Sequence, residues 1–352
     1  QEPWPEMAAV EALLAKYDEP LEKMHRAAEL GGAARYPVDF ASGSTVPLRH
    51  LQQLRGAVGL LRLKSEIAAL RQDVPSAAEA IATIFAAAQS LENEPTLVSQ
   101  LVRLALDGMA RGQLERHLPG TPFSDEDLAS LDRRLAASDY AASFHRAMLG
   151  ARAQSVMYFD NPVLLGASAP SSLSAVFRPS DQIVYLKSME KFIEAFESSG
   201  PALRDAVVDA EDQVRQFANE PLARLRYPIS MAILPAIDPY PGAVNRAIAY
   251  RDSVRVALAI ERFRLRHRKL PQKLAVLVPE FLPEVPLDPF DGEPLRYRVD
   301  ETEYAIYSIG GDGIDQGGQT ITLPQPNTHS LEDLVFRVRI GEGSATVKQD
   351  VE

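Results

Sequence analysis

The chain has 352 residues, of which 46% are hydrophobic, and it carries a formal net charge of −11. This length and apolar content can form a substantial core, divided over two or three domains. No run of about 18 or more apolar residues occurs, so the sequence predicts no membrane-spanning segment. The complete absence of cysteine excludes disulfides, thiolate metal sites and cysteine nucleophiles.

The acidic charge is concentrated near the C-terminus. Residues 271–352 contain 15 Asp and Glu against 6 Lys and Arg, a net charge of −9, which leaves −2 for the first 270 residues. A field of this sign disfavours nucleic acid and anionic membranes, and it favours cations or basic partners.

Residues 1–156 are predicted to form an N-terminal helical array. Apolar residues recur at three- and four-residue steps, as in the segment from Leu51 to Arg71. Ser76 with Glu79 and Ser124 with Asp127 have the spacing of capping boxes, which begin helices. Short connections favour antiparallel hairpins, and no shared fingerprint with a period of roughly 20–50 residues indicates a regular solenoid. We therefore expect an irregular antiparallel array.

Residues 157–181 are expected to form a loop or linker, because Pro, Ser, Ala and Gly dominate them and periodicity is weak. A second helical segment follows over residues 182–270 and includes a long helix over 242–270. The apolar, proline-bounded segment 227–241 is interpreted as core packing, with a partner or ligand groove as the alternative.

The long helix combines a polar stripe with a wide apolar face. Val254, Leu258 and Phe263 belong to the apolar face, so most of the helix should be buried against other helices. Pro271 should end it. The polar stripe consists of Arg251, Arg255, Arg262, Arg266 and Lys269.

Residues 271–352 have the pattern of a small α/β module. Prolines fix an extended path, and Asp291-Gly292 marks a tight turn. The segments 295–299 and 304–309 alternate with a period of two, which predicts a β-hairpin. The predicted fold class is mainly α, an irregular antiparallel helical array followed by this α/β C-terminal module.

Residues 250–335 resemble the C-terminal part of the major pseudopilin of type II secretion systems. The shared features are a long helix ended by a proline, a short leucine-rich helix, the turn D-P-F-D-G, two strands and a glycine-aspartate loop. The extra Asp-Gly in the turn departs from the family, and the helix lacks a pilin's membrane-spanning N-terminus. The resemblance implies a pilin-like module rather than a pilin subunit.

The whole chain also resembles a group of uncharacterised bacterial proteins that place a helical array before this module. The stretches R-Y-P-V-D-F, E-P-T-L-V-S-Q-L-V-R-L-A and L-P-x-x-L-x-x-L-V-P carry that resemblance, which implies no known activity. The start at Gln1 fits removal of a signal peptide or anchor, and equally a shortened chain. We expect an extracytoplasmic protein, periplasmic or secreted.

The loop G-G-D-G-I-D-Q-G-G over residues 310–318 is the strongest candidate site. Glycines let the backbone turn sharply, and closely spaced carboxylates supply hard oxygen ligands suited to Ca²⁺. An ordinary glycine-rich turn with exposed aspartates is the alternative, since the spacing is not that of an EF-hand. The pseudopilin resemblance favours calcium and implies Asp312 as the best-matched ligand, with Asp315 and Asp333 as looser matches.

Patterns that could carry catalysis are weak. Ser188 and Lys191 have S-x-x-K spacing without its companion motifs, and we interpret them as a solvated helix face. Glu22 and His25 form an E-x-x-H without the second copy that a di-iron site needs. An ordinary charged helix surface is the interpretation for Asp205, Asp209 and Asp212.

The sequence thus predicts an extracytoplasmic, non-enzymatic assembly or binding protein with a calcium-stabilised module and a protein partner. The alternative is a hydrolase or ligand-binding enzyme with a site between the helical array and residues 157–181. A deep pocket with convergent polar groups would favour the second, and a broad apolar or charged face the first.

Overall fold

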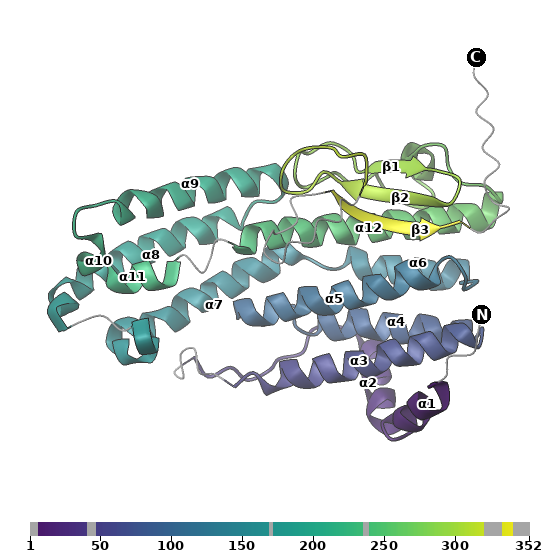
Figure 1. The fold of residues 1–352 in the computed structure, drawn as a ribbon, viewed down its shortest axis with the longest axis horizontal. Coiled ribbons are helices and arrows are strands. Elements are labelled where there is room, and N and C mark those ends of the chain that lie inside the picture. Colours follow the sequence, from purple (N-terminus) through teal and green to yellow (C-terminus); the bar gives the residue numbers. More distant parts are fainter. Residues whose placement is uncertain (1–5, 41–46, 169–171, 235–238, 320–332, 341–352) are drawn as a thin grey trace, which may run out of the picture.

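Helices make up most of the chain, and a three-stranded antiparallel sheet lies near its C-terminus, as the sequence predicts. This computed structural model describes residues 6–40, 47–168, 172–234, 239–319 and 333–340. Figure 1 shows the helices in layers along the long axis, with the sheet at one end. No helix within these ranges is long and apolar enough to cross a membrane.

The N-terminal array is a set of antiparallel helices, and in α4, α5 and α6 a side chain caps the first turn. Ser124 and Asp127 form the predicted capping box at the start of α6. The predicted box at Ser76 is wrong, because its helix begins earlier, at Val74, and Asp73 accepts the hydrogen bond from the Ser76 amide. The helices are α1 (Met7–Ala15), α2 (Asp18–Leu30), α3 (Arg49–Leu70), α4 (Val74–Gln89), α5 (Leu97–His117) and α6 (Asp125–Ala136).

The second helical segment leaves less loop between residues 157 and 181 than predicted. Two 3₁₀-helices, η2 (Pro162–Ser168) and η3 (Ser172–Phe177), follow α7, and Pro179 lies in the first turn of α8. Prolines there begin helices rather than interrupt them, because the first turn leaves its amides unbonded. The remaining helices are α7 (Tyr140–Asp160), α8 (Arg178–Ala195), α9 (Gly200–Ala218), α10 (Ala223–Arg226) and α11 (Pro228–Ile233).

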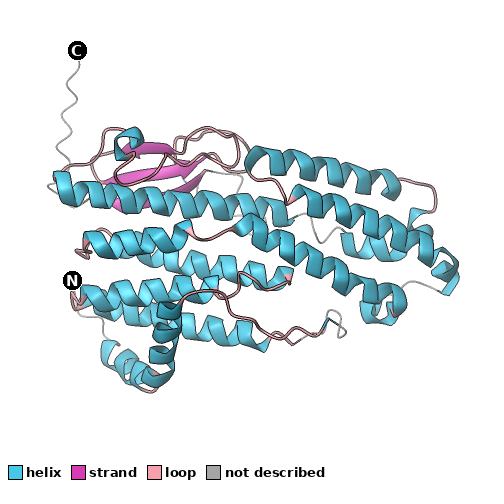
Figure 2. Ribbon diagram, turned by 180° about the vertical axis from the view of Figure 1, so that it is seen from behind, coloured by secondary structure: helices cyan, strands magenta, loops and turns pink. Residues whose placement is uncertain are grey.

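The long helix α12 (Pro239–His267) joins the two larger hydrophobic cores among the described residues. Near its start, Val244 packs with α7, α8 and α9, whereas Leu258 and Ile260 pack with the N-terminal array. Two arginines of its predicted polar stripe face α6, where Arg255 and Arg262 pair with aspartates at 2.8 Å. Figures 1 and 2 show α12 between the helical array and the sheet.

The C-terminal module places its sheet on α12. The predicted hairpin is confirmed as β1 (Arg296–Val299) and β2 (Glu303–Ser308), preceded by the 3₁₀-helix η5 (Leu274–Leu277). A third strand, β3 (Leu334–Arg339), pairs antiparallel with β2 and was not predicted. Its alternate side chains Leu334, Phe336 and Val338 are buried.

Candidate functional site

The fold brings Asp333 back to the glycine-aspartate loop. The loop follows β2, and Asp333 directly precedes β3. The Oδ2 atom of Asp333 accepts hydrogen bonds from the amides of Gln316 (3.1 Å) and Gly318 (2.7 Å). The Gln316 side-chain oxygen in turn accepts from the Asp333 amide at 2.9 Å. The predicted association of Asp333 with this loop therefore has a geometric basis in strand pairing.

Asp312 and Asp315 hold the loop through short-range hydrogen bonds. Asp312 accepts from the Ile314 amide (3.0 Å) and from the Gln316 side-chain amide (2.7 Å). Asp315 accepts from the Gly317 amide at 2.8 Å, and its other oxygen lies 3.6 Å from the Arg296 guanidinium. Gly317 has a φ of 72°, a left-handed conformation that favours glycine.

The electrostatics of the loop centre on Asp333. Its side chain is 7% exposed, and its Oδ1 atom has no hydrogen-bond partner. Burial raises the pKa of this carboxyl, two backbone amides lower it, and the negative charges of Asp315 and Asp312 raise it again. A buried, unpartnered carboxylate oxygen is costly unless a cation or donor meets it.

The three predicted ligands accept hydrogen bonds from donors of the loop itself. Among the described residues, no group of three or more His, Asp or Glu side chains is arranged to hold a metal ion. Of the carboxylate oxygens of these three residues, only Oδ1 of Asp333 could bind a cation without breaking an existing contact. At Asp312 the cation would have to displace the Gln316 side-chain amide, and at Asp315 it would compete with Arg296.

The weak catalytic patterns are separated by the fold. Ser188 is buried, which corrects the expectation that it lies on a solvated face, whereas Lys191 is half exposed and pairs with Glu194 at 3.2 Å. His25 is buried against Thr83 (2.6 Å) and Lys64 (3.0 Å). The described contacts of these residues give no nucleophile with an adjacent base.

The other acidic residues that the sequence analysis considered as candidates lie on the surface. Glu22 forms an i,i+4 ion pair with Arg26, next to the buried His25. Exposed positions on α9 are occupied by Asp205, Asp209 and Asp212, and Asp212 pairs with Arg215 at 2.6 Å. An ordinary charged surface is confirmed for them.

A pocket that the sequence did not reveal lies beneath α12. Its lining comes from α5, α7 and α12, together with Phe85 of α4 and Leu135 of α6. The polar side chains are Asp107, Arg111, Tyr140, Arg246, Tyr250 and Arg251. Two glycines in the middle of α5, Gly108 and Gly112, are the signal that could have pointed to an open helix surface.

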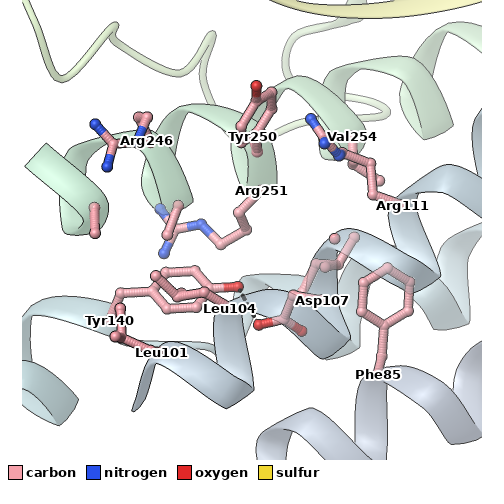
Figure 3. Close-up of a pocket in the computed structure, with 14 residues that line it drawn as sticks. Phe85, Leu101, Leu104, Asp107, Arg111, Tyr140, Arg246, Tyr250, Arg251 and Val254 are labelled. Atoms are coloured by element: carbon pink, nitrogen blue, oxygen red, sulfur yellow. Dashed lines mark hydrogen bonds between the residues drawn. The ribbon is translucent and has the colours of Figure 1, made fainter. Parts of the chain in front are cut away.

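Asp107 and Tyr140 form the polar floor of this pocket (Figure 3). The Tyr140 hydroxyl donates to Asp107 Oδ2 at 3.0 Å. Burial raises the pKa of the Asp107 carboxyl to about 6, against the opposing charge of Arg103 and the Tyr140 hydrogen bond. The same burial, with Asp107 beside it, raises the pKa of Tyr140. Tyr140 is therefore the donor at neutral pH.

Asp107→Asn is expected to stabilise the protein at pH 7. An acid whose pKa is raised on folding destabilises the folded state above its unfolded pKa, and this cost grows from about pH 4 to about pH 6 and is then constant. Asparagine keeps an acceptor for Tyr140 without the charge, so the free energy of unfolding should rise by about 1–3 kcal/mol at pH 7 and change little at pH 4. Urea unfolding of both proteins at the two pH values measures this. An equal difference at both values would contradict it.

Comparisons with known proteins give no family model, no curated protein and no solved structure that matches this chain. The pseudopilin resemblance of residues 250–335 thus stays a prediction from the motifs themselves. The same holds for the resemblance of the whole chain to helical bacterial proteins.

Proposed function

We propose that this chain is a non-enzymatic binding protein whose C-terminal module is stabilised by Ca²⁺ held at Asp312, Asp315 and Asp333. The observation that carries the calcium site is the unpartnered, buried Oδ1 atom of Asp333. A divalent cation satisfies that oxygen and offsets the repulsion from Asp312 and Asp315. The net charge of −9 over residues 271–352 favours its approach.

The proposed setting is extracytoplasmic, and the proposed partner is a protein. Oxygen-only sites in extracellular modules bind calcium in the range of about 10⁻⁴ to 10⁻³ M, so such a site is filled where calcium is plentiful. The acidic C-terminal module suits a basic partner surface. The pocket described above lies beneath α12 and is not lined by residues 157–181, the segment of the alternative enzyme site.

Calcium is expected to raise the melting temperature of protein first stripped of metal. Ligand at about 100 times its Kd stabilises the folded state by roughly 2.7 kcal/mol. Asp333→Asn should abolish most of this gain, because asparagine keeps one acceptor for the Gln316 and Gly318 amides but presents an NH₂ group where Oδ1 lies. Asp312→Ala should also lose most of it. Thermal melts with calcium, magnesium and chelator measure the shifts.

Asp300→Ala is the matched control within the same module. Asp300 accepts from the amides of Thr302 and Glu303 at 2.9 Å in the turn between β1 and β2, away from the loop. Its loss should lower the melting temperature but leave the calcium-induced shift intact. If millimolar calcium does not change the melting temperature of the parent protein, the loop is an ordinary glycine-rich turn and the calcium proposal is wrong. A hydrolase activity lost on Ser188→Ala would overturn the non-enzymatic part.

A further inference from the structure

The pocket beneath α12 has the size and walls of a small-molecule site. Its volume is about 300 Å³, at the lower end of the range of about 300–1,000 Å³ typical of ligand pockets. Most of its exposed wall is apolar, and this wall includes Leu101 and Leu104 from α5 and Ala247 and Val254 from α12. A molecule with a short apolar body fits such walls.

Two guanidinium groups face this pocket without a carboxylate partner. Arg246 of α12 and Arg111 of α5 form no ion pair among the described residues, although Glu115 attracts Arg111 from one turn away. Arg251 differs, because Asp252 accepts two hydrogen bonds from it at 2.9 Å and the Ser138 carbonyl a third at 2.7 Å. Two guanidinium groups at the pocket can therefore bind an anionic ligand.

Other arginines of α12 have carboxylate partners, whereas Arg246 has none among the described residues. Outside the pocket, Arg255 pairs with Asp132 and Arg262 with Asp125, each at 2.8 Å. Guanidinium groups that leave water are ordinarily matched by a carboxylate or by hydrogen-bond acceptors. Among the described residues neither is present at Arg246, so we infer that an anion from outside the chain is its partner.

The two arginines lie along one wall with an aromatic ring between them (Figure 3). Arg246 and Tyr250 are four residues apart on α12 and so share a helix face. The Arg111 guanidinium packs 3.6 Å from the centre of the Tyr250 ring, which orients it. Burial lowers the pKa of Arg246, a sign that its charge is partly removed from water. An anion placed here gains charge-assisted hydrogen bonds in a poorly hydrated site.

Arg103 adds to the positive field from behind the Tyr140 ring, although it does not line the pocket. Arg103 is 1% exposed, lies 4.7 Å from the Tyr140 ring centre, and leaves its Nε and Nη2 atoms without partners. Asp107 is the only acidic side chain among the residues that line the pocket, and it already accepts from Tyr140. A cationic ligand would therefore be repelled by several arginines, and the one carboxylate of the lining already accepts a hydrogen bond from Tyr140.

We propose that this pocket binds a small amphipathic anion, a carboxylate or phosphate headgroup on a short apolar body. The headgroup lies beside the Tyr250 ring, where Arg246 and Arg111 meet it, and the apolar body packs on Leu104 and Ala247. No group in the pocket forms a nucleophile and base pair, so the site binds its ligand without transforming it. This activity is independent of calcium at residues 310–318.

The test uses four eight-carbon probes that share one apolar body and differ in headgroup. Isothermal titration with octanoate, octyl phosphate, octan-1-ol and octylammonium compares two anions, a neutral analogue and a cation. We expect one octanoate or octyl phosphate per chain, binding at least about tenfold more tightly than octan-1-ol, and no binding of octylammonium. The ratio of the two anions identifies the headgroup.

Matched variants assign the binding to the pocket. Arg246→Met and Arg111→Met keep the apolar stem and remove the charge, so each should weaken anion binding about tenfold while leaving octan-1-ol within about twofold. Arg262→Met on the same helix, outside the pocket, is the control and should leave every affinity unchanged. Thermal melts verify that each variant is folded.

Gly108→Leu keeps the proposal testable if an arginine variant fails to fold. A Cβ atom at Gly108 meets nothing within 4 Å, and the residue lines the pocket within α5, so leucine fills the cavity without a backbone clash. It should abolish binding of all probes without lowering the melting temperature. Equal affinities for octanoate and octan-1-ol, or anion binding that survives both Arg246→Met and Gly108→Leu, would overturn the proposal.

Discussion

Replacing Asp288 by alanine is expected to lower the free energy of unfolding by about 3–5 kcal/mol, one of the two largest effects we predict for a single change. Asp288 belongs to the turn D-P-F-D-G between α12 and the sheet and is fully buried. The Arg296 guanidinium donates to its Oδ2 atom at 2.7 Å. Alanine leaves that cation partly buried with a weaker set of partners.

The same carboxylate also joins the turn to the end of β2. It accepts from the Phe290 amide (2.9 Å), the Ser308 hydroxyl (2.8 Å) and the Ile309 amide (2.9 Å). Alanine removes all of these acceptors at once and leaves buried donors unsatisfied, which is more costly than the loss of an exposed hydrogen bond. The module should therefore loosen as a unit.

Asp291→Ala is the matched control in the same turn. Asp291 also contacts Arg296 but is 24% exposed, and Arg296 would keep Asp288 as its partner. We expect a loss of about 1 kcal/mol, since partly solvated pairs contribute little. Chemical denaturation of both variants measures the difference. Similar losses for the two would show that Asp288 does not hold the module together.

The sequence predicts the fold class well because hydrophobic periodicity is a local signal. The hairpin of β1 and β2 is confirmed from its period-two alternation, and the capping box at Ser124 marks the start of α6. The missed strand β3 carries the same alternation in L-V-F-R-V-R, so its signal was present. The loop predicted over residues 157–181 was too long because proline is compatible with both a loop and the first turn of a helix, as Pro162 and Pro179 show.

The pocket could not be predicted, because its polar groups meet only through tertiary packing. Asp107 and Tyr140 are 33 positions apart, and Arg246 comes from a helix in the second segment. Each reads alone as an ordinary charged or aromatic residue of an amphipathic helix. The lack of a carboxylate for Arg246 is a property of its neighbours in space, which spacing along the chain does not encode. The loop residues Asp312 and Asp315 could be predicted as ligands from the sequence because they are only three positions apart.

The second large effect is expected at Gly150, where α7 meets the segment before α5. A Cβ atom at Gly150 would lie 1.8 Å from the Pro95 carbonyl oxygen and 2.8 Å from its carbonyl carbon. Both are backbone atoms, so no rotation of a side chain relieves the overlap. The neighbouring Glu94 is 2% exposed and bonds to His50 at 3.1 Å, so a shift of this segment disturbs a buried polar contact.

Gly150→Ala should therefore destabilise the protein even though alanine favours helices. Overpacking of a buried contact costs typically about 1–3 kcal/mol and more where backbone must move, against a gain in helix propensity of about 1 kcal/mol. We expect a net loss of about 2–4 kcal/mol. The matched control is Gly112→Ala in α5, where a Cβ atom meets nothing within 4 Å and the same substitution should stabilise by about 1 kcal/mol. Urea unfolding should give opposite signs for the two glycines, and equal signs would show that α7 and the segment at Pro95 do not approach this closely in solution.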